Sequence, residues 1–124
     1  MSLRLTPRNL EAAYEYLITT APFNKWKLPD ADDLEFHVTS DKKRYGHLQA
    51  VTDTKYTKTA NKLVIALSGI HSKTTHTIME TMAHECCHLK RFLEGGHKAM
   101  THGPRFKKLA RAVCKAHGFD IRTF

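Results

Sequence analysis

No run of 18 apolar residues occurs in this chain of 124 residues, so the sequence predicts no membrane-spanning helix. Residues 1–7 lack the apolar stretch of a secretory signal peptide, and we therefore do not expect secretion. The three cysteines include no Cys-x-x-Cys pair, which argues against a disulfide framework and against a zinc ribbon. These absences favour a cytoplasmic protein, or one of the nucleoid or nucleus if it associates with DNA.

Acidic residues are scarce relative to basic ones. The chain has 12 Asp and Glu against 20 Lys and Arg, which gives a formal net charge of +8. Such a charge favours polyanionic partners, nucleic acid first, although a basic surface that only keeps the protein in solution is the plainer reading. Hydrophobic residues make up 41% and charged residues 26%, which is typical of a folded globular protein and not of a disordered one.

Internal repeats, low-complexity tracts and linker-like segments are also missing, so we expect a single domain over residues 1–124. Thr6 followed by Pro7, with apolar residues at helical spacing behind them, predicts a helix over residues 7–20. Short apolar segments predict three strands of a small, mostly antiparallel sheet, at residues 34–38, 45–51 and 63–67.

The second half of the chain predicts two more helices. Ser72 or Thr74 is expected to cap a long helix that runs to about residue 93, where a glycine pair ends it. Pro104 is expected to open a last helix, which Gly118 closes. The order of helix, strands, helix and helix predicts the α+β class.

Histidine is abundant, with nine in the chain and six of them within residues 71–102. Residues 84–88 read His-Glu-Cys-Cys-His, which is the pattern His-Glu-x-x-His. On a helix, residues four apart lie one turn above each other, so His84 and His88 can reach the same metal ion. Glu85 then lies beside the position of a metal-bound water, where it can act as a general base.

The phase of the long helix supports this interpretation. At about 100° per residue its apolar side comprises Ile78, Met79, Met82, Cys86, Leu89 and Leu93. His84 and His88 fall on the opposite side, with Glu85 on a flank. The polar side also carries Thr77, Thr81 and Arg91. The two histidines are therefore expected to line the space above the helix and not the core.

A catalytic zinc ion has three protein ligands, so a third must come from elsewhere in the chain. No glutamate follows Glu94, which excludes a glutamate ligand on a later helix. His102 is the best candidate, because it lies after a glycine pair that lets the chain turn back and directly before the last helix. His97 is the second choice, and Asp120 and His117 are weaker ones. The thiol of Cys87 stays open as a ligand, whereas Cys86 is interpreted as a core residue.

Taken together, the His-Glu-x-x-His segment and the later segment His102-Gly103-Pro104-Arg105-Phe106 resemble the SprT/Spartan family of zinc metalloproteases. The resemblance covers roughly residues 44–114 and implies a minimal zincin fold. It implies one Zn²⁺ on His84, His88 and His102, with Glu85 as the general base. Eukaryotic members of the family cut proteins crosslinked to DNA and use DNA as an activator. Many members carry a C-terminal zinc ribbon, which is not expected here because only 22 residues follow His102.

The sequence therefore predicts a zinc-dependent endopeptidase with a protein substrate, and proteins bound or crosslinked to DNA are candidates for that substrate. The stabiliser of the oxyanion stays open among Tyr45, Tyr56 and Arg91. The alternative is a non-catalytic nucleic-acid-binding module, in which a structural metal is closed by a fourth ligand from Cys87, His97 or Cys114. A metal-dependent nuclease is a third interpretation, weaker because the clustered carboxylates that hold magnesium are missing.

Nucleic-acid contacts, if any, must come from the domain's own basic surface. The basic residues expected to form it are Lys107, Lys108, Arg111 and Lys115 of the last helix and Lys42, Lys43 and Arg44 of a turn. A charge run on an amphipathic helix is usually just its solvated face, so both interpretations stay open.

Overall fold

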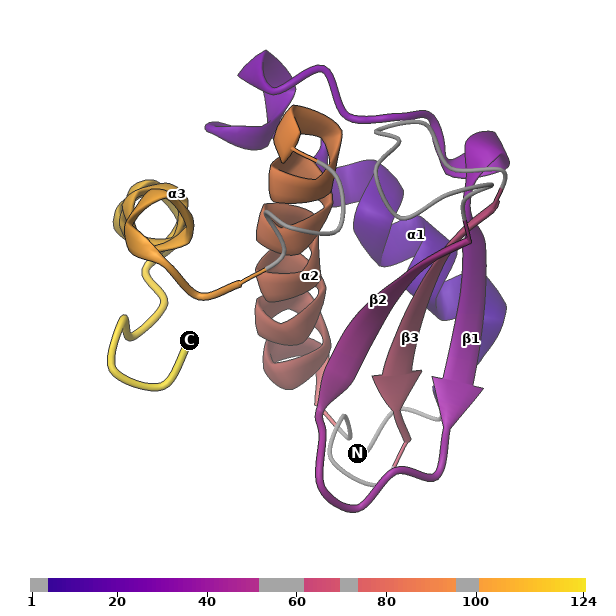
Figure 1. The fold of residues 1–124 in the computed structure, drawn as a ribbon. Helices are drawn as coiled ribbons and strands as arrows, with labels where there is room; N and C mark the ends of the chain where they lie inside the picture. The colour runs from indigo at the N-terminus through magenta and orange to yellow at the C-terminus, as the bar shows by residue number, and fades with distance from the viewer. Residues whose placement is uncertain (1–4, 52–61, 70–73, 96–100) are drawn as a thin grey trace.

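The described part of the chain, residues 5–51, 62–69, 74–95 and 101–124, has the predicted α+β class (Figure 1). It is seen here in a computed structural model. None of its helices has both the length and the apolar character that crossing a membrane requires. The main elements are α1 (Pro7–Leu17), β1 (Glu35–Thr39), β2 (Gly46–Val51), β3 (Lys62–Ser68), α2 (Thr75–Gly95) and α3 (Pro104–His117). Two short 3-10 helices, η1 (Phe23–Lys25) and η2 (Ala31–Asp33), lie between α1 and β1.

The N-terminal helix starts where the sequence predicts and ends earlier. The hydroxyl oxygen of Thr6 accepts a hydrogen bond of 3.1 Å from the backbone N–H of Asn9, which caps the first turn. The predicted helix over residues 7–20 stops at Leu17 instead. The hydroxyls of Thr19 and Thr20 donate to backbone carbonyls of the last turn at 2.6 and 2.7 Å. Because these carbonyls are satisfied by side chains, the helix can end without a glycine.

The two later helices have the predicted boundaries. Thr74 caps α2, because its hydroxyl oxygen accepts a hydrogen bond of 3.1 Å from the backbone N–H of Thr77. The other predicted cap, Ser72, lies outside the described residues. Pro104 is the first residue of α3, and Gly118 follows its end with a φ of 78°, a left-handed conformation that glycine adopts without strain.

The sheet is mixed and not mostly antiparallel. Its strand order is β1-β3-β2, with β1 parallel and β2 antiparallel to β3. Strands that follow each other in sequence usually pair, but β1 and β2 do not pair here. The later strand β3 instead lies between them, so that β2 is left at one edge of the sheet (Figure 1). This edge strand is the one that borders the site described below.

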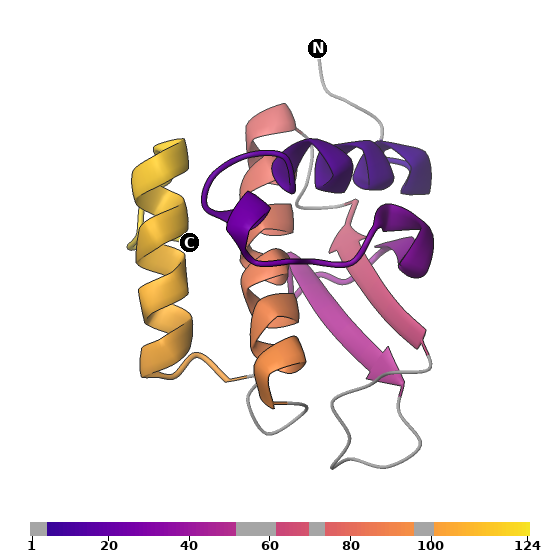
Figure 2. The same cartoon turned by 90° about the horizontal axis from the view of Figure 1, so that it is seen from above.

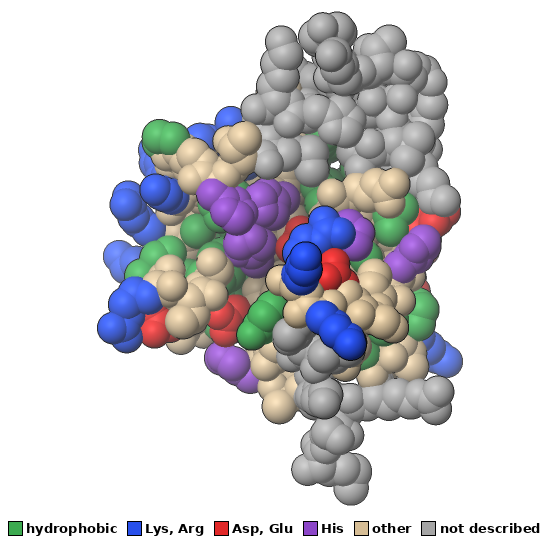
Figure 3. Space-filling view, turned by 60° about the horizontal axis from the view of Figure 1, so that its bottom comes forward, with side chains coloured by type: hydrophobic (Ala, Val, Ile, Leu, Met, Phe, Trp, Pro, Cys, Tyr) green, Lys and Arg blue, Asp and Glu red, His purple; other side chains and the backbone are tan. Residues whose placement is uncertain are grey.

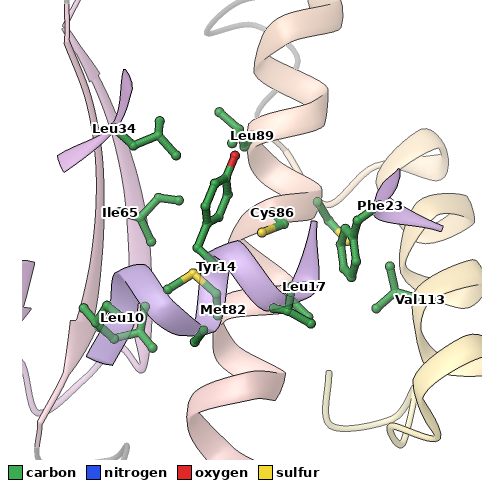
Figure 4. Close-up of a cluster of buried hydrophobic side chains, with 14 of the residues drawn as sticks. Leu10, Tyr14, Leu17, Phe23, Leu34, Ile65, Met82, Cys86, Leu89 and Val113 are labelled. Atoms are coloured by element: carbon green, nitrogen blue, oxygen red, sulfur yellow. The ribbon is translucent and has the colours of Figure 1, made fainter. Parts of the chain in front are cut away.

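Helices α1 and α2 lie on the same side of the sheet, and α3 lies on the far side of α2 (Figure 2). The core between them includes Tyr14 of α1, whose ring lies among side chains of the sheet and of α2 (Figure 4). The predicted apolar side of α2 is confirmed: Ile78, Met82, Cys86 and Leu89 are buried, and Met79 and Leu93 pack against the core.

One expectation for α2 is wrong. The helical phase predicts Thr81 on the polar side of the helix, yet only 8% of it is exposed, and Glu85 one turn later is buried as well. The reason is the edge strand, whose first residue, Gly46, lies directly against these two side chains. The helix therefore has covered surfaces toward the sheet and toward α3, and a narrower open face than its sequence indicates.

Candidate metal centre

Three imidazole side chains converge on the open face of α2. His84 and His88 come from consecutive turns of that helix, and His102 comes from the segment directly before α3. Their ligand atoms all lie within 4.8 Å of one another, and the Nε2 atoms of His88 and His102 are 2.9 Å apart. Within the described residues, this is the one group of three or more potential metal ligands at such distances. In the space-filling view a group of histidines lies together at the surface (Figure 3).

These residues fit a zinc ion. Nitrogen ligands bind zinc at about 2.0–2.1 Å, so two of them on a tetrahedral ion are roughly 3.4 Å apart. The observed spacing is of that order, and small rotations of the imidazoles are sufficient to close the difference. The Nδ1 atom of His88 is buried and has no hydrogen-bond partner among the described residues. Three nitrogen donors are also the ligand number that leaves a zinc position open for water.

The ring of Phe106, in the first turn of α3, contacts all three imidazoles. Its centroid lies 4.5 Å from that of His88, 4.7 Å from that of His102 and 5.2 Å from that of His84. Phe106 itself is buried in the core between α2 and α3. The aromatic ring therefore limits the orientations that the three imidazoles can adopt.

A charged network holds the start of α3 against the end of α2. The carboxylate of Glu94 accepts from Arg91 at 2.6 Å and from Arg105 at 2.7 Å. These two cations keep the pKa of Glu94 low, at about 2, with the hydrogen bond from Arg105 as the larger cause. Because Arg105 follows His102 by three residues, the network fixes the chain next to the third imidazole.

Glu85 lies beside the histidines, and only 3% of it is exposed. Its Oε1 atom is buried and has no hydrogen-bond partner among the described residues. Its Oε2 atom faces Gly46. A Cβ atom added at residue 46 would lie only 3.4 Å from this oxygen. An unpartnered buried carboxylate is costly for stability, and such groups are typical of functional sites.

Burial sets the protonation of these groups in the metal-free protein. It raises the pKa of Glu85 to about 8, and the charge of Arg44 acts weakly in the opposite direction. Burial also lowers the pKa of His84 to about 4 and that of His88 to about 3, and the neighbouring imidazoles add to both shifts. His84 and His88 are therefore neutral at pH 7, which is the form that binds a metal.

A cavity of about 590 Å³ opens above the three histidines and Glu85. Its walls come from α2, from residues 44–48 at the start of β2, from His102 and from residues 123 and 124. Of the candidates for oxyanion stabilisation, Tyr45 lines this cavity, and 55% of it is exposed. Arg91 is bound to Glu94, away from the cavity, and Tyr56 lies outside the described residues.

The weaker ligand candidates lie elsewhere. The Nε2 atom of His117 is 3.0 Å from Thr20 Oγ1, and Asp120 binds Arg122. His97 lies outside the described residues. The thiols of Cys87 and Cys114 are buried and free, and neither belongs to the histidine group. Burial raises the pKa of the Cys87 thiol well above its usual range, which disfavours the thiolate form that binds metals.

The predicted basic residues flank the histidines instead of forming one patch. All seven are exposed: Lys107, Lys108, Arg111 and Lys115 on α3, and Lys42, Lys43 and Arg44 in the turn before β2. Lys and Arg side chains lie on both sides of the histidine group in Figure 3. Arg44 is also bound to Asp41, whose Oδ2 atom is 3.0 Å from its Nε atom. Arg44 lines the cavity, so it belongs to the site more directly than the other six.

Sequence reasoning missed two residues of the site, Gly46 and Phe124. Gly46 borders Glu85, and Phe124 contacts His84 with ring centroids 5.3 Å apart. Both lie about forty residues from the motif in sequence, and neither carries a chemical group that a motif search would select.

Comparison with known proteins adds one match. Residues 21–124 match the SprT-like family. No curated protein and no solved structure matched the chain. The matched residues include β1 to β3, α2 and α3, and thus every residue of the histidine group, Glu85 and Gly46.

Proposed function

This chain belongs to the SprT-like family, and from that premise we propose that it is a zinc-dependent endopeptidase. The observation that carries the proposal is the convergence of His84, His88 and His102 beside the buried carboxylate of Glu85, under an open cavity. Three imidazoles can bind a divalent cation and leave a coordination position for water or for a substrate carbonyl. The cavity above them is large enough to admit a segment of polypeptide.

The residues of the site have separate tasks in peptide hydrolysis. Zinc, when bound, polarises the scissile carbonyl and lowers the pKa of water. Glu85 takes the proton of the attacking water on its carboxylate and transfers it to the leaving amine. Its pKa of about 8 in the metal-free protein falls when a cation is bound nearby, because positive charge favours the carboxylate form. Gly46 and Thr81 exclude solvent from one side of this carboxylate.

Replacement of Glu85 by glutamine tests the assignment. The amide keeps the shape of the side chain and cannot take up the proton, so we expect zinc to be retained and cleavage to fall by about 10²–10⁴-fold. His88→Ala should lose both zinc and cleavage. The measurements are zinc content by elemental analysis and cleavage of a basic DNA-binding protein, with and without a chelator.

The matched control is Glu15→Gln, which changes an exposed carboxylate on α1. It should behave like the wild type in both measurements. Cleavage by the Glu85→Gln protein at the wild-type rate would disprove the role of Glu85. Thiolate charge-transfer bands in the cobalt-substituted protein would instead indicate a structural site with a cysteine ligand.

We further propose that the substrates are proteins bound to DNA. The support is the net charge of +8 together with the exposed lysines and arginines that flank the cavity. Each phosphate contact makes the slope of log K against log salt more negative by about 0.9 for duplex DNA. If Lys107, Lys108 and Arg111 are replaced by alanine, the steepness of this salt dependence should fall by up to about 3.

A variant with the same loss of charge serves as the control for DNA binding. It replaces three exposed basic residues outside both flanks: Arg8, Lys25 and Lys27. This control should keep the salt slope of the wild type. If both triple variants weaken DNA binding equally, the effect is one of net charge, and the basic flank on α3 is not a DNA site.

A further inference from the structure

The segment that follows α3, residues 119–124, turns back toward α2 (Figures 1 and 2). We call it the post-α3 segment. Two of its residues, Thr123 and Phe124, line the cavity above the proposed metal ligands. Phe124 is only partly buried, so a part of its surface is left uncovered. The roles given above to the histidines and to Glu85 do not account for this wall of the cavity.

The ring of Phe124 lies directly beside the metal centre. Its centroid is 5.3 Å from that of His84, which is one of the proposed ligands. Each residue of an extended peptide spans roughly 3.3 Å, so the ring is within reach of a substrate side chain that lies about two residues or fewer from the scissile bond. What this ring can contact therefore bears on which peptide bonds are cut.

A chain of stacked rings holds Phe124 in this position. Phe119 stacks on Phe124 with centroids 6.0 Å apart, and on His117 at the end of α3 with centroids 5.6 Å apart. The Nε2 atom of His117 is in turn 3.0 Å from Thr20 Oγ1 and 3.0 Å from the carbonyl oxygen of Ala21. The ring of Phe124 is thereby connected to α3 and to the segment that follows α1.

Hydrogen bonds within the post-α3 segment fix its turn. The backbone N–H of Thr123 donates to the Asp120 carbonyl at 3.1 Å, and the backbone N–H of Arg122 donates to the Asp120 carboxylate at 2.9 Å. The ring of Phe119 also lies 5.7 Å from that of His76 on α2, in an edge arrangement. The wall is therefore formed before a ligand arrives, and a ligand that binds to it does not have to order the segment.

The facing wall of the cavity also offers apolar surface. It is formed by the start of β2, which lies on the other side of α2 from the post-α3 segment (Figure 1). Tyr45, which is exposed, and Leu48, which is partly buried, line the cavity there. An apolar side chain that enters the cavity can thus be covered from both walls, which is where the hydrophobic effect is largest.

The charged side chains of the cavity other than Glu85 and the histidines already have partners. Glu80 Oε2 lies 3.1 Å from His76 Nε2, and Glu80 Oε1 accepts from the Thr123 hydroxyl at 3.5 Å. Arg44 is bound to Asp41 at 3.0 Å. A charged side chain of a substrate would have to compete with these contacts, whereas an apolar one would not.

We propose that Phe124 is a specificity-determining residue, whose ring receives a large apolar side chain of the substrate, of the size of leucine or phenylalanine, close to the scissile bond. Tyr45 and Leu48 cover the same side chain from the facing wall. This inference deepens the proposed function and rests on it, because the occupant of the cavity is taken to be a polypeptide that is to be cut.

Cleavage of a mixed peptide library by the zinc-loaded full chain tests the preference, with the cut sites identified by mass spectrometry. We expect leucine, phenylalanine and methionine to be enriched at a position within about two residues of the cut. In the best peptide, alanine at that position should lower kcat/KM by about 10- to 200-fold for the wild type. This difference should largely disappear in the Phe124→Ala protein.

Two further variants separate specificity from packing. Ile121→Ala removes an exposed apolar side chain of the same segment that does not line the cavity, and it should keep the wild-type preference. Phe124→Leu keeps the wall apolar and leaves more room, so it should shift the preference from leucine toward the larger phenylalanine. This shift tests the proposal even if Phe124→Ala does not fold.

Contact with the ring can also be observed without cleavage. The leucine peptide bound to the zinc-loaded Glu85→Gln protein should show nuclear Overhauser effects between its leucine methyl groups and the ring protons of Phe124. The absence of these contacts in the complex would refute the apolar subsite.

The outcomes distinguish the inference from the proposed function. Cleavage without an apolar preference, or the wild-type preference in the folded Phe124 variants, would overturn the inference and leave the peptidase intact. A preference for lysine would do the same and would point to Glu80 as the determinant. A wild-type protein that cuts no peptide would refute the proposed function itself.

Discussion

At the scale of single residues, the site depends on a side chain that is missing as much as on those that are present. Gly46, the first residue of β2, lies where a Cβ atom would be 2.9 Å from Thr81 Cγ2 and 3.1 Å from the Ala66 carbonyl. Glu85 lies on the same side, with Oε2 3.4 Å from that position. The absence of a side chain lets the edge strand cover the carboxylate.

We therefore predict that Gly46→Ala destabilises the protein and lowers its activity. Overpacking of this kind costs about 1–3 kcal/mol. A displacement of Glu85 by a fraction of an ångström to 1 Å lowers cleavage on the order of 10- to 100-fold. Urea unfolding measures the first effect, and cleavage of the protein substrate measures the second.

A second substitution shows whether the crowded contact is the cause. Thr81→Ser removes the Cγ2 atom that lies nearest to the new methyl group. In the Gly46→Ala/Thr81→Ser protein, part of the lost stability should return, so that the two changes are not additive. Strict additivity would contradict the steric explanation.

The sequence was sufficient for those residues of the site whose chemistry is explicit. His84, Glu85 and His88 follow from helical spacing, and the choice of His102 followed from the missing third ligand; the structure brings its ring to the other two. Gly46 and Phe124 could not be found in this way, because Gly46 acts through an absent side chain and Phe124 contacts His84 only through an apolar ring. Their roles depend on which strand and which segment the fold places next to α2.

At the scale of elements, the site is divided between α2 and the start of α3, and the Glu94 network joins them. Glu94 has a pKa of about 2 in the folded protein, against an ordinary value of 4.5. A group whose pKa is lowered by folding contributes stability at pH values above its unfolded pKa, and the contribution is lost as the pH falls toward the folded pKa. The stability that Glu94 contributes is therefore lost as the pH falls from about 4.5 to about 2.

We predict that Glu94→Gln lowers the free energy of unfolding at neutral pH by about 0.5–1 kcal/mol. The value is small because Arg105 is 43% exposed and solvent screens the pair. Urea unfolding at several pH values should show that the difference from the wild type shrinks below about pH 4.5 and is nearly absent near pH 2. Glu15→Gln serves as the control, and a difference for Glu94→Gln that stays constant down to pH 2 would contradict the ion-pair explanation.

The elements themselves differ in how far the sequence determines them. Caps and apolar periodicity are local, and so α2 and α3 have the predicted boundaries. The order of the strands is not local: β3 lies between β1 and β2 because its apolar residues complete the core, and no pattern within residues 34–51 indicates this. The edge position of β2, which covers Glu85, was for the same reason beyond prediction.

At the scale of the whole molecule, the three histidines connect parts of the chain that meet only in the folded state. His84 and His88 belong to α2, which packs against the sheet and α1, whereas His102 leads into α3. An ion held by all three joins α3 to the rest of the core. Metal binding should therefore stabilise the entire fold, because the unfolded chain does not bring the ligands together.

The last prediction follows from this linkage. Zinc at 100 times its dissociation constant should add about 2.7 kcal/mol to the free energy of unfolding. For a chain of this size that corresponds to a rise in Tm of roughly 10 °C, measurable by calorimetry and reversed by a chelator. His102→Ala should lose most of the rise, because two imidazoles on one helix bind an ion without joining α3. Thr101→Ala, at the preceding exposed position, should keep it. An equal rise in the His102→Ala protein would mean that His84 and His88 hold the ion with another partner, and the three-histidine site would have to be abandoned.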